Sequence, residues 1–331
     1  MSHIFRNRPF FCNYWLTYRC NSKCTFCHIW RDPQLKDIGD AQFKTVKKNL
    51  DDLKKIGIKM IDFTGGEPLL NRELPEILSY ARHLGFFVKL ATNGLLYPEK
   101  AEELRGCANR VYISFDTTSA EEYEKIRGVN GFQTVLESIR VAKSLNQDIC
   151  LFSTITNQNI KNIVDIVEFA QKNKVFVYFH PCFSYFDNTP LAQDNIKMIK
   201  KYFWQPYVRM NLPQLAFHQT GGNDPRHPSC KVGKSTLDIG PDDCLTLPCF
   251  HKHFTRVKIN KNLLMLYNSD EWVRMFDNAG RYGFCKHCTI DCYFGLSYWD
   301  RVGRYFIKQN VSFLKDFIEN QRASSSFFRR I

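Results

Sequence analysis

Residues 11–27 have the sequence FCNYWLTYRCNSKCTFC, an apolar run followed at once by three closely spaced cysteines. The run Phe11–Thr17 is typical of a β-strand. Cys20, Cys24 and Cys27 then follow with the spacing C-x3-C-x2-C. Thiolates this close on one loop favour a multinuclear iron–sulfur site, in which three ligands leave a fourth iron open. Three free thiols, or part of a zinc site, are the alternatives that spacing alone leaves open.

A second motif, Gly65-Gly66-Glu67-Pro68, follows the next expected strand, Lys59–Phe63. Two glycines allow the backbone to approach a ligand closely, and Glu67 offers an acceptor to an amine. Alone, such a motif is most often only a turn. It follows the second strand while the cysteines follow the first, and function in a sheet of this kind lies at the carboxyl ends of the strands. The two motifs together therefore indicate a functional site much more strongly than either motif alone.

Short apolar runs alternate with helix-period segments as far as about residue 180. Strand–helix alternation of this kind predicts an α/β fold with a parallel sheet and covering helices. Crossovers should be right-handed. Six units are too few for a closed eightfold barrel, so we predict an open or partial (β/α)6 TIM-like barrel. The expected strands are Phe11–Thr17, Lys59–Phe63, Phe86–Ala91, Arg110–Phe115, Ile149–Ile155 and Val175–Phe179, and the expected helices are 41–55, 72–84, 98–104, 131–145 and 159–172.

The composition indicates the cellular compartment and the kinds of partner that we expect for this protein. The 331 residues include 13 cysteines and carry a net charge of +13. No uncharged apolar run of about 18 residues is present and no signal peptide is expected, so we expect a cytoplasmic, reducing compartment. Cysteines there are better explained by metal binding or catalysis than by disulfides. The positive charge is spread out and does not choose among an anionic substrate, a membrane surface and nucleic acid. No nucleic-acid-binding motif is present, so no nucleic acid partner is expected.

Together, the two motifs resemble the radical S-adenosylmethionine (radical SAM) superfamily over about residues 11–180. The resemblance implies that Cys20, Cys24 and Cys27 hold a [4Fe–4S] cluster. It also implies that the glycine–glycine–glutamate motif holds the methionine amino group of S-adenosylmethionine. Asn93 as a turn residue and Arg127 as a surface charge are the alternatives for those two positions. The cofactor-binding residues that the resemblance implies are Phe26, Gly65, Gly66, Glu67, Thr92, Asn93, Ser114, Asp116, Arg127 and Asn157.

The resemblance also implies a reaction. A reduced cluster passes one electron to the sulfonium, which cleaves to methionine and a 5′-deoxyadenosyl radical, and that radical abstracts hydrogen from an unreactive carbon. The protein supplies positioning and the exclusion of water. The electron is expected from a donor such as flavodoxin or ferredoxin.

Six further cysteines lie near the C-terminus. One fully ligated cubane takes four thiolates, so six suit one auxiliary [4Fe–4S] cluster with two thiols to spare. A structural zinc with four sulfur ligands fits the spacing equally well. The segment STLDIGPDDCLTLPC (residues 235–249) resembles the twitch/SPASM extension of radical SAM enzymes. That resemblance favours the single-cluster twitch form and implies the ligands Cys230, Cys249, Cys285 and Cys288, with Cys292 as an alternative to Cys288.

Three residues are candidates for catalysis. Cys244 stands where the twitch/SPASM pattern has a turn glycine, so we expect a strained or special residue there. A thiol near the substrate, Cys244 or Cys292, could donate a hydrogen atom to a carbon radical and give net epimerisation. Packing cysteines or spare ligands are the alternative for both. His180, at the end of the sixth strand, is the acid–base candidate, whereas Cys182 is expected to be a small core residue.

The sequence divides into four parts: a radical SAM barrel (1–181), a helix and linker with substrate-facing loops (182–229), an auxiliary-cluster domain (230–292), and a basic amphipathic helix and tail (293–331). In the second part, residues 188–211 are expected to form one helix. The helix expected near residues 298–318 should pack its apolar face on its own domain, and membrane contact is the alternative.

The leading interpretation is a radical SAM oxidoreductase or epimerase that acts on a small molecule or a peptide, with an auxiliary cluster that assists oxidation, epimerisation or substrate positioning. Modification of a lipid or peptide at a membrane surface, by a cytoplasmic protein associated with that membrane, is an alternative. An iron–sulfur carrier or a peptide-binding scaffold without catalysis is an alternative of another class. The complete cysteine triad together with Glu67 argues against a pure scaffold.

Overall fold

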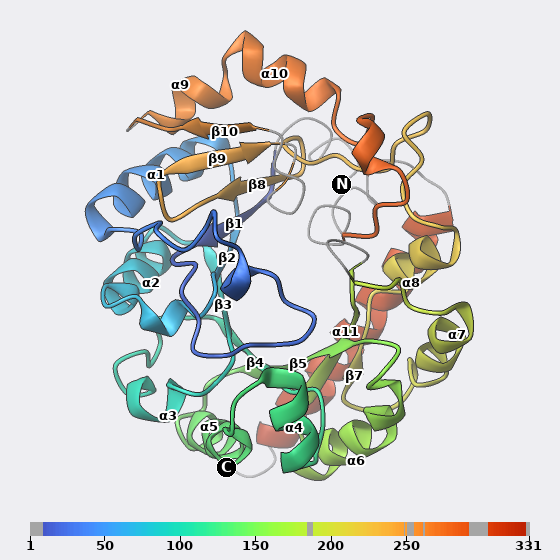
Figure 1. Cartoon of the computed structure of the whole chain (residues 1–331). Coiled ribbons are helices and arrows are strands. Elements are labelled where there is room, and N and C mark those ends of the chain that lie inside the picture. The colour runs from blue at the N-terminus through green and yellow to red at the C-terminus, as the bar shows by residue number, and fades with distance from the viewer. Residues whose placement is uncertain are drawn as a thin grey trace.

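The computed structural model describes residues 9–183, 188–247, 249, 255–260, 262–290 and 304–328. Its centre is a curved sheet with helices around the outside (Figure 1). Within the described residues the sheet has ten strands in the order β10-β9-β8-β1-β2-β3-β4-β5-β6-β7. Neighbours from β1 to β6 pair in parallel and follow the order of the sequence. The predicted α/β fold with a partial parallel barrel is therefore confirmed.

Each of the six predicted strands is present, with ends that differ from the prediction by at most two residues. The strands are β1 (Phe11–Trp15), β2 (Met60–Thr64), β3 (Phe87–Thr92), β4 (Arg110–Ser114), β5 (Ile149–Ile155) and β6 (Phe176–Pro181).

The C-terminal part of the chain extends this sheet at one edge. β8 (Thr236–Ile239) pairs in parallel with β1, and β9 (Cys244–Leu247) and β10 (Thr255–Lys258) follow as antiparallel neighbours. At the other edge, β7 (Val208–Arg209) pairs in parallel with β6. The predicted auxiliary-cluster part therefore shares backbone hydrogen bonds with the barrel and is joined to β1, the strand that leads into the cysteine motif.

Helices follow most of the strands. The helices from the first half of the chain include one that the sequence analysis missed, α4, between β4 and α5. They are α1 (Phe43–Ile56), α2 (Leu74–His83), α3 (Tyr97–Lys100), α4 (Ala120–Arg127), α5 (Phe132–Ser144) and α6 (Ile163–Asn173), and the later helices are α7 (Gln193–Lys201), α8 (Leu212–Gln219), α9 (Leu263–Tyr267), α10 (Asp270–Asp277) and α11 (Arg304–Phe328).

The expectation of one helix over residues 188–211 was wrong. That segment holds α7, a turn and the short strand β7. Tyr207 adopts a left-handed conformation (φ 63°) just before β7, which is incompatible with a continuing helix. The stretch expected as a linker begins instead with α8, in which Pro213 lies in the first turn. Proline lacks an N–H group but needs none at that position of a helix.

The two faces of the barrel strands differ in composition because side chains alternate along a strand. Tyr14, Phe63, Leu90 and Val111 are buried on the outer face, where Tyr14 accepts a hydrogen bond from Asn49 of α1 at 2.9 Å. The inner face carries polar and aromatic residues instead. Asp62 and Lys89 are register partners there and form an ion pair of 3.0 Å.

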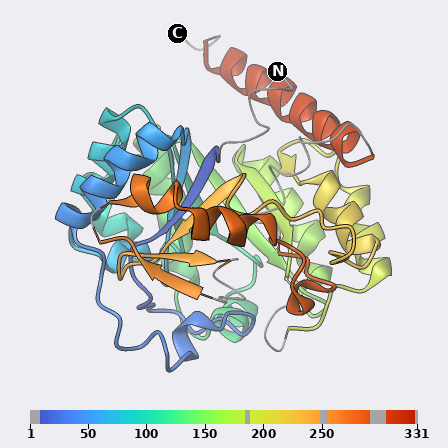
Figure 2. The ribbon, with the colours of Figure 1, turned by 90° about the horizontal axis from the view of Figure 1, so that it is seen from above.

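α11 lies across the end of the barrel opposite the segment between β1 and α1 (Figure 2). Ser312 and Lys315 are buried at its contact with the barrel, while Ile307, Leu314 and Phe317 are at least half exposed. The expectation that this helix packs its apolar face on its own domain is therefore confirmed only in part: Tyr305 packs on Phe217 and Val311 on the core, but the three exposed residues do not. Within the described part of the chain, no helix has the length and apolar character needed to cross a bilayer.

Candidate functional site

The GGEP motif leaves the carboxyl end of β2 and packs against the chain that leaves β1. Gly66 N donates to the Thr17 carbonyl and Glu67 N to the Arg19 carbonyl, each at 2.8 Å. A Cβ atom at Gly65 or Gly66 would overlap those same carbonyl oxygens. In this structure the glycines are thus needed for close approach to the protein's own backbone, and an approach to a cofactor stays a prediction.

Glu67 is fully buried and anchors a hydrogen-bond network. Its Oε1 accepts from Thr92 Oγ1 at 2.8 Å and from Leu69 N at 3.1 Å, and its Oε2 accepts from Asn93 N at 2.7 Å. Burial raises the pKa of the Glu67 carboxyl to about 7, against the opposing effect of these hydrogen bonds. A carboxylate has about four acceptor sites, so Oε2 retains capacity for one more donor, such as an ammonium group.

Asn93 connects Glu67 to the cysteine loop. Its backbone bonds to Glu67, while its side-chain Nδ2 donates to Asn21 Oδ1 at 2.7 Å and to Ser22 Oγ at 3.0 Å. The same Nδ2 lies 3.9 Å from Cys20 Sγ. The structure therefore brings together Glu67, Thr92, Asn93 and Cys20, all of which the sequence analysis selected.

A buried ion pair supports the middle of the cysteine loop. Arg127 and Asp116 form this pair, with side chains that are 6% and 1% exposed. Asp116 Oδ1 also accepts from Thr154 N at 2.8 Å, and Arg127 Nη1 lies 3.5 Å from Cys24 Sγ. The guanidinium carbon is 5.4 Å from the centre of the Phe26 ring. Arg127 is therefore not the surface charge that the sequence analysis kept as an alternative, and its contacts with a cofactor stay a prediction.

The helix α4 carries this arginine and also holds the loop through its backbone. Lys23 N donates to the Arg127 carbonyl at 2.8 Å, and Thr25 N donates to the Ile126 carbonyl at 2.9 Å. Gly128 ends the helix with φ 65°, and a Cβ there would lie 2.7 Å from the Lys23 carbonyl oxygen. Free carbonyls at the end of a helix are thus used to fix the cysteine loop.

The three cysteines of the loop lie close enough to influence one another electrostatically. Burial, together with a smaller effect of the Cys24 charge, raises the pKa of Cys20 to about 12 and that of Cys27 to about 11. Such thiols lose their protons readily only when a cation binds them. The donor set of three soft sulfurs beside Arg127 suits an iron–sulfur cluster. Among the described residues, no three His, Cys, Asp or Glu side chains are already grouped around one ion position, so the ligands stay a prediction.

A cavity of about 470 Å³ adjoins the cysteine loop. Phe26 lines it from that loop, Asn159 and Asn162 line it from the segment after β5, and Cys182 lines it from the end of β6. Burial, aided by Asp116 and Cys27, raises the pKa of the Cys182 thiol to about 12. Cys182 therefore belongs to the site region, and not only to the core as its apolar sequence neighbours indicated.

Two further predicted cofactor-binding residues, Asn157 and Ser114, have other neighbours in this structure, and their contacts with a cofactor stay predictions. The Asn157 side chain donates to the Pro190 carbonyl at 3.0 Å and accepts from Ala192 N at 2.9 Å, so it supports the entry to α7 and is not among the residues that line the cavity. Ser114 is half-buried on β4, in register with Phe152. Asn162, which sequence reasoning missed, donates to the Asp116 carbonyl at 3.3 Å.

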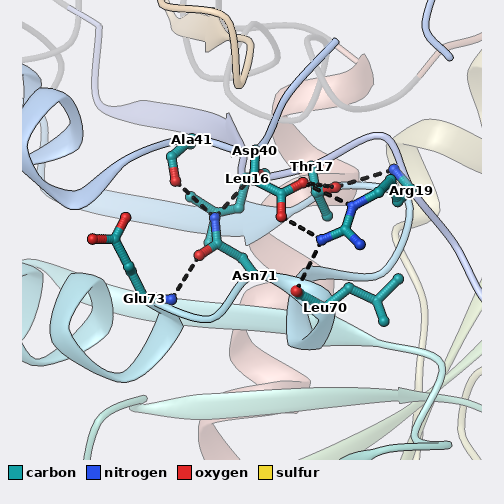
Figure 3. A network of polar contacts seen from close by, with 8 residues as sticks. All are labelled: Leu16, Thr17, Arg19, Asp40, Ala41, Leu70, Asn71 and Glu73. Atoms are coloured by element: carbon teal, nitrogen blue, oxygen red, sulfur yellow. Dashed lines mark hydrogen bonds and ion pairs between the residues drawn. The ribbon is translucent and has the colours of Figure 1, made fainter. Parts of the chain in front are cut away.

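The ends of the cysteine loop are tied together by polar contacts (Figure 3). Asn71 Nδ2 donates to the carbonyls of Leu16 at 3.2 Å and Ala41 at 2.8 Å. Asp40 accepts from Thr17 Oγ1 at 2.7 Å and from Arg19 Nε at 3.0 Å. These contacts close a neck at residues 16–19 and 40–41, from which the segment with the three cysteines extends.

We expect Asn71→Ala to lower the free energy of unfolding by about 2 kcal/mol, because the Ala41 carbonyl loses its donor and the Leu16 carbonyl, which also accepts from Ala41 N, loses one of two. Urea denaturation of the apoprotein measures this loss. Asn268→Ala is the matched control, since Asn268 also donates to a carbonyl (Leu264, 2.8 Å) but is exposed. An Asn71 variant as stable as the Asn268 variant would show that the neck contributes little.

The second group of cysteines surrounds Asn223. Cys230, Cys249 and Cys288 belong to one small apolar cluster, and Cys285 is close enough to raise the pKa of Cys230, which burial already raises strongly. Asn223 Nδ2 donates to the Gly280 carbonyl at 2.8 Å and the Cys285 carbonyl at 3.1 Å. The predicted ligands thus share one region. Asn223, a residue that sequence reasoning missed, organises their loops.

The catalytic candidates have different surroundings. Cys244 is the first residue of β9 and has no positive φ; Asp243 before it supplies that conformation at φ 58°, so the expected strain at Cys244 was wrong. Aspartate tolerates this conformation better than most residues. Burial lowers the pKa of His180 to about 3, and its Nε2 lies 3.0 Å from Gln214 Nε2. His180 is therefore neutral at physiological pH. Cys292 lies outside the described residues.

Comparisons with known proteins agree with this arrangement. The family described as the radical SAM superfamily matches residues 15–170. A probable GTP 3′,8-cyclase of Sulfolobus acidocaldarius is 31% identical over 173 residues, which cover 50% of this chain and 55% of that protein. An Fe-coproporphyrin III synthase of Methanosarcina barkeri is 32% identical over 166 residues, covering 48% of this chain and 40% of that protein. The chain thus spans about half the length of the curated relatives that it matches.

A solved structure shows the same fold over a longer stretch. Streptococcus suis SuiB, in a crystal structure with the precursor peptide SuiA, aligns with a TM-score of 0.65 and 18% identity, covering 80% of this chain and 66% of that one. This likeness shows a shared fold. The match of residues 15–170 to the radical SAM superfamily is separate, and that similarity implies S-adenosylmethionine and a [4Fe–4S] cluster with cysteine ligands.

Proposed function

We propose that the whole chain is a radical SAM enzyme. A [4Fe–4S] cluster held by Cys20, Cys24 and Cys27 would supply the electron that cleaves S-adenosylmethionine and so generates a 5′-deoxyadenosyl radical. The observation that carries this proposal is the hydrogen-bonded chain from Glu67 through Asn93 to the cysteine loop, which ends 3.9 Å from Cys20 Sγ. This chain supports a role for Glu67 as the acceptor for an ammonium group near the proposed cluster ligands.

The chain's own groups would bind and orient the cofactor. Glu67 Oε2 would accept from the amino group, while Asn93 and the Arg127–Asp116 pair keep the loop in place. The cavity beside Phe26, which has both apolar and polar side chains in its walls, would take another part of the cofactor. The test is formation of 5′-deoxyadenosine when anaerobic, cluster-loaded protein receives dithionite and S-adenosylmethionine. An inert but loaded protein would support the iron–sulfur carrier instead.

The binding of S-adenosylmethionine should depend on pH through Glu67. Because the pKa of this carboxyl is raised to about 7, it is largely protonated below pH 7 and must lose its proton to bind a cation. We expect the affinity of the wild type, relative to Glu67→Gln, to rise about fivefold from pH 6 to pH 7 and about tenfold from pH 6 to pH 8, where it levels off. Calorimetry with both proteins measures this ratio, in which the cofactor's own ionisation cancels. A ratio that does not change with pH would contradict the role of Glu67.

We further propose a peptide or small-molecule substrate that enters the inner face of the barrel. The support is the composition of that face. Lys89, paired with Asp62, lies 4.8 Å from the centre of the Tyr112 ring, and the Phe152 and Tyr178 rings stack at 5.6 Å. A cation beside a row of aromatic rings suits a substrate with an anionic group and an apolar or planar part. Mass spectrometry of candidate peptides after turnover in deuterated solvent tests for oxidation, which lowers the mass, or epimerisation, which incorporates deuterium.

The remaining proposals concern the C-terminal cysteines and the reductant. We propose that Cys230, Cys249, Cys285 and Cys288 hold one auxiliary [4Fe–4S] cluster. The support is that three of them share one apolar cluster and that Cys285 lies close enough to Cys230 to raise its pKa. Such a cluster could assist oxidation or position the substrate. The electron for the first cluster is proposed to come from a donor of the flavodoxin or ferredoxin type. Counting iron and sulfide separates one cluster from two, and iron from zinc.

A further inference from the structure

The C-terminal helix α11 exposes a row of apolar side chains that a surface helix would usually bury. Ile307, Leu314, Phe317 and Ile318 are 62%, 57%, 50% and 41% exposed, and these four residues are named here the α11 stripe. Residues at spacings of 7, 10 and 11 share one face of an α-helix. A surface helix normally turns such a face towards the core, whereas α11 turns it away.

Buried polar contacts hold the helix in this orientation. Lys315 Nζ donates to the Val208 carbonyl at 2.6 Å and pairs with Glu319 at 2.7 Å. Ser312 Oγ accepts from Leu212 N at 3.2 Å. Turning the helix so that the stripe faced the barrel would strand the Val208 carbonyl and the Leu212 N–H without partners. The polar contacts between α11 and the barrel therefore keep the stripe exposed.

A second copy of the chain fits this surface poorly. Four side chains that are each about half exposed offer on the order of 400 Å², roughly half of the ~800 Å² per partner that a standard interface buries. Residues 304–331 hold six basic and two acidic residues, and the whole chain carries a net charge of +13. Two such surfaces repel each other, but both the charge and the apolar stripe complement an anionic lipid surface.

Neighbouring residues strengthen the case for lipid. Trp204 is 72% exposed and packs on Phe203 at 4.8 Å between ring centres, and the Phe203 ring lies 5.6 Å from Lys315 Nζ of α11. Tryptophan is enriched where proteins meet the headgroup region of bilayers. Lys200 lies near Lys308 of α11, and burial together with that like charge lowers the pKa of Lys200. Positive charge is therefore gathered where α7 and α11 approach each other.

We propose that the α11 stripe and Trp204 bind the surface of an anionic lipid bilayer. The helix lies flat in the interface and does not cross it, so the apolar side chains enter the headgroup region while basic residues meet the lipid phosphates. Since α11 and the cysteine loop are at opposite ends of the barrel (Figure 2), the loop would face away from the bilayer.

The test is flotation of the full-length, cluster-loaded protein with vesicles of phosphatidylcholine, either pure or with phosphatidylglycerol as a third of the lipid. We expect binding to the anionic vesicles that weakens with salt, and a loss of about 10–100-fold in Leu314→Glu/Phe317→Glu. Met265→Glu is the matched control, because Met265 on α9 is 68% exposed and lies outside the stripe. It should bind like the wild type.

Three results would overturn the proposal. The first is absence of wild-type binding to anionic vesicles, and the second is equal binding by the wild type and the stripe variant. The third is a concentration-dependent dimer that the stripe variant abolishes while vesicle binding is absent, since this would assign the stripe to a second copy of the chain. Cleavage of S-adenosylmethionine by the stripe variant, measured alongside, shows whether its fold is intact.

Discussion

Arg127→Met is expected to lower the free energy of unfolding of the apoprotein by about 3–5 kcal/mol at pH 8, because it leaves the Asp116 carboxylate buried without its counter-charge. The partners are almost inaccessible, at 6% and 1% exposure, so solvent cannot replace the lost interaction. The cost is increased by the loss of the contact with Cys24 and of the ring contact with Phe26.

The loss should shrink at lower pH. Burial already raises the pKa of Asp116 in the wild type, and removal of Arg127 raises it further. A carboxyl whose pKa is higher in the folded than in the unfolded state makes the fold less stable as pH rises, so the Arg127→Met defect should be smaller at pH 5 than at pH 8. Chemical denaturation at both values measures it. Asp116→Asn/Arg127→Met should recover part of the loss and show little dependence on pH.

The control for this prediction lies on the same helix. Lys125 pairs with Glu121, but both side chains are more than two-thirds exposed. Lys125→Met removes the same charge two residues from Arg127 and should cost at most about 0.5 kcal/mol. Equal losses in the Arg127 and Lys125 variants would show that the buried pair does not carry the stability assigned to it.

The barrel was predictable because its strands and helices differ in period. Segments such as FVKLAT (residues 87–92) are short, apolar on alternate positions and bounded by glycine or asparagine, which is typical of strands. The residue types at alternate positions also indicate which face of the sheet is polar. Parallel strands buried on both faces are usually apolar throughout, so Asn13, Asp62 and Lys89 on alternate positions indicated a polar inner face.

The missed helix α4 illustrates where local patterns need tertiary contacts. Its hydrophobic face is small, and Arg127, which a periodicity argument places on the surface, is buried against Asp116 and the cysteine loop. A signal for its start was nevertheless present. Ser119 and Glu122 have capping-box spacing, and Ser119 Oγ accepts from Glu122 N at 3.4 Å. Gly128 marks its end in the same way.

Other features could not be inferred from sequence alone. The convergence of Cys230, Cys249, Cys285 and Cys288 depends on tertiary contacts such as the bonds of Asn223 to the Gly280 and Cys285 carbonyls, and the spacing of cysteines in the sequence does not specify such contacts. Similarly, the apolar residues of α11 predicted a buried face. The orientation of α11 on the barrel depends on Lys315. Its ammonium group donates to the Val208 carbonyl and to Glu319, and the bond to Val208 forms only when this side of the helix faces the barrel.

The triple variant Cys20→Ala/Cys24→Ala/Cys27→Ala is expected to lose formation of 5′-deoxyadenosine completely. Removing one thiol leaves two ligands that could retain a partial cluster, whereas removing all three leaves the loop without any soft donor. The neck at Asn71 and the backbone contacts to α4 do not involve the cysteine side chains, so the fold should persist. Because burial opposes ionisation of the Cys20 and Cys27 thiols by raising their pKa values, cluster binding has to supply the free energy of their deprotonation.

Metal analysis separates the two cysteine groups in the same experiment. If the C-terminal group holds its own cluster, the wild type should contain about eight irons and the triple variant about four. The control Cys12→Ala/Cys107→Ala/Cys150→Ala removes as many thiols from buried positions of the core, at a cost of about 1 kcal/mol each, and should keep all iron and turnover. Continued cleavage of S-adenosylmethionine by the triple loop variant would refute the assignment of the cysteine loop. A wild type with only four irons would refute the auxiliary cluster while leaving the loop assignment intact, because the two groups share no ligand.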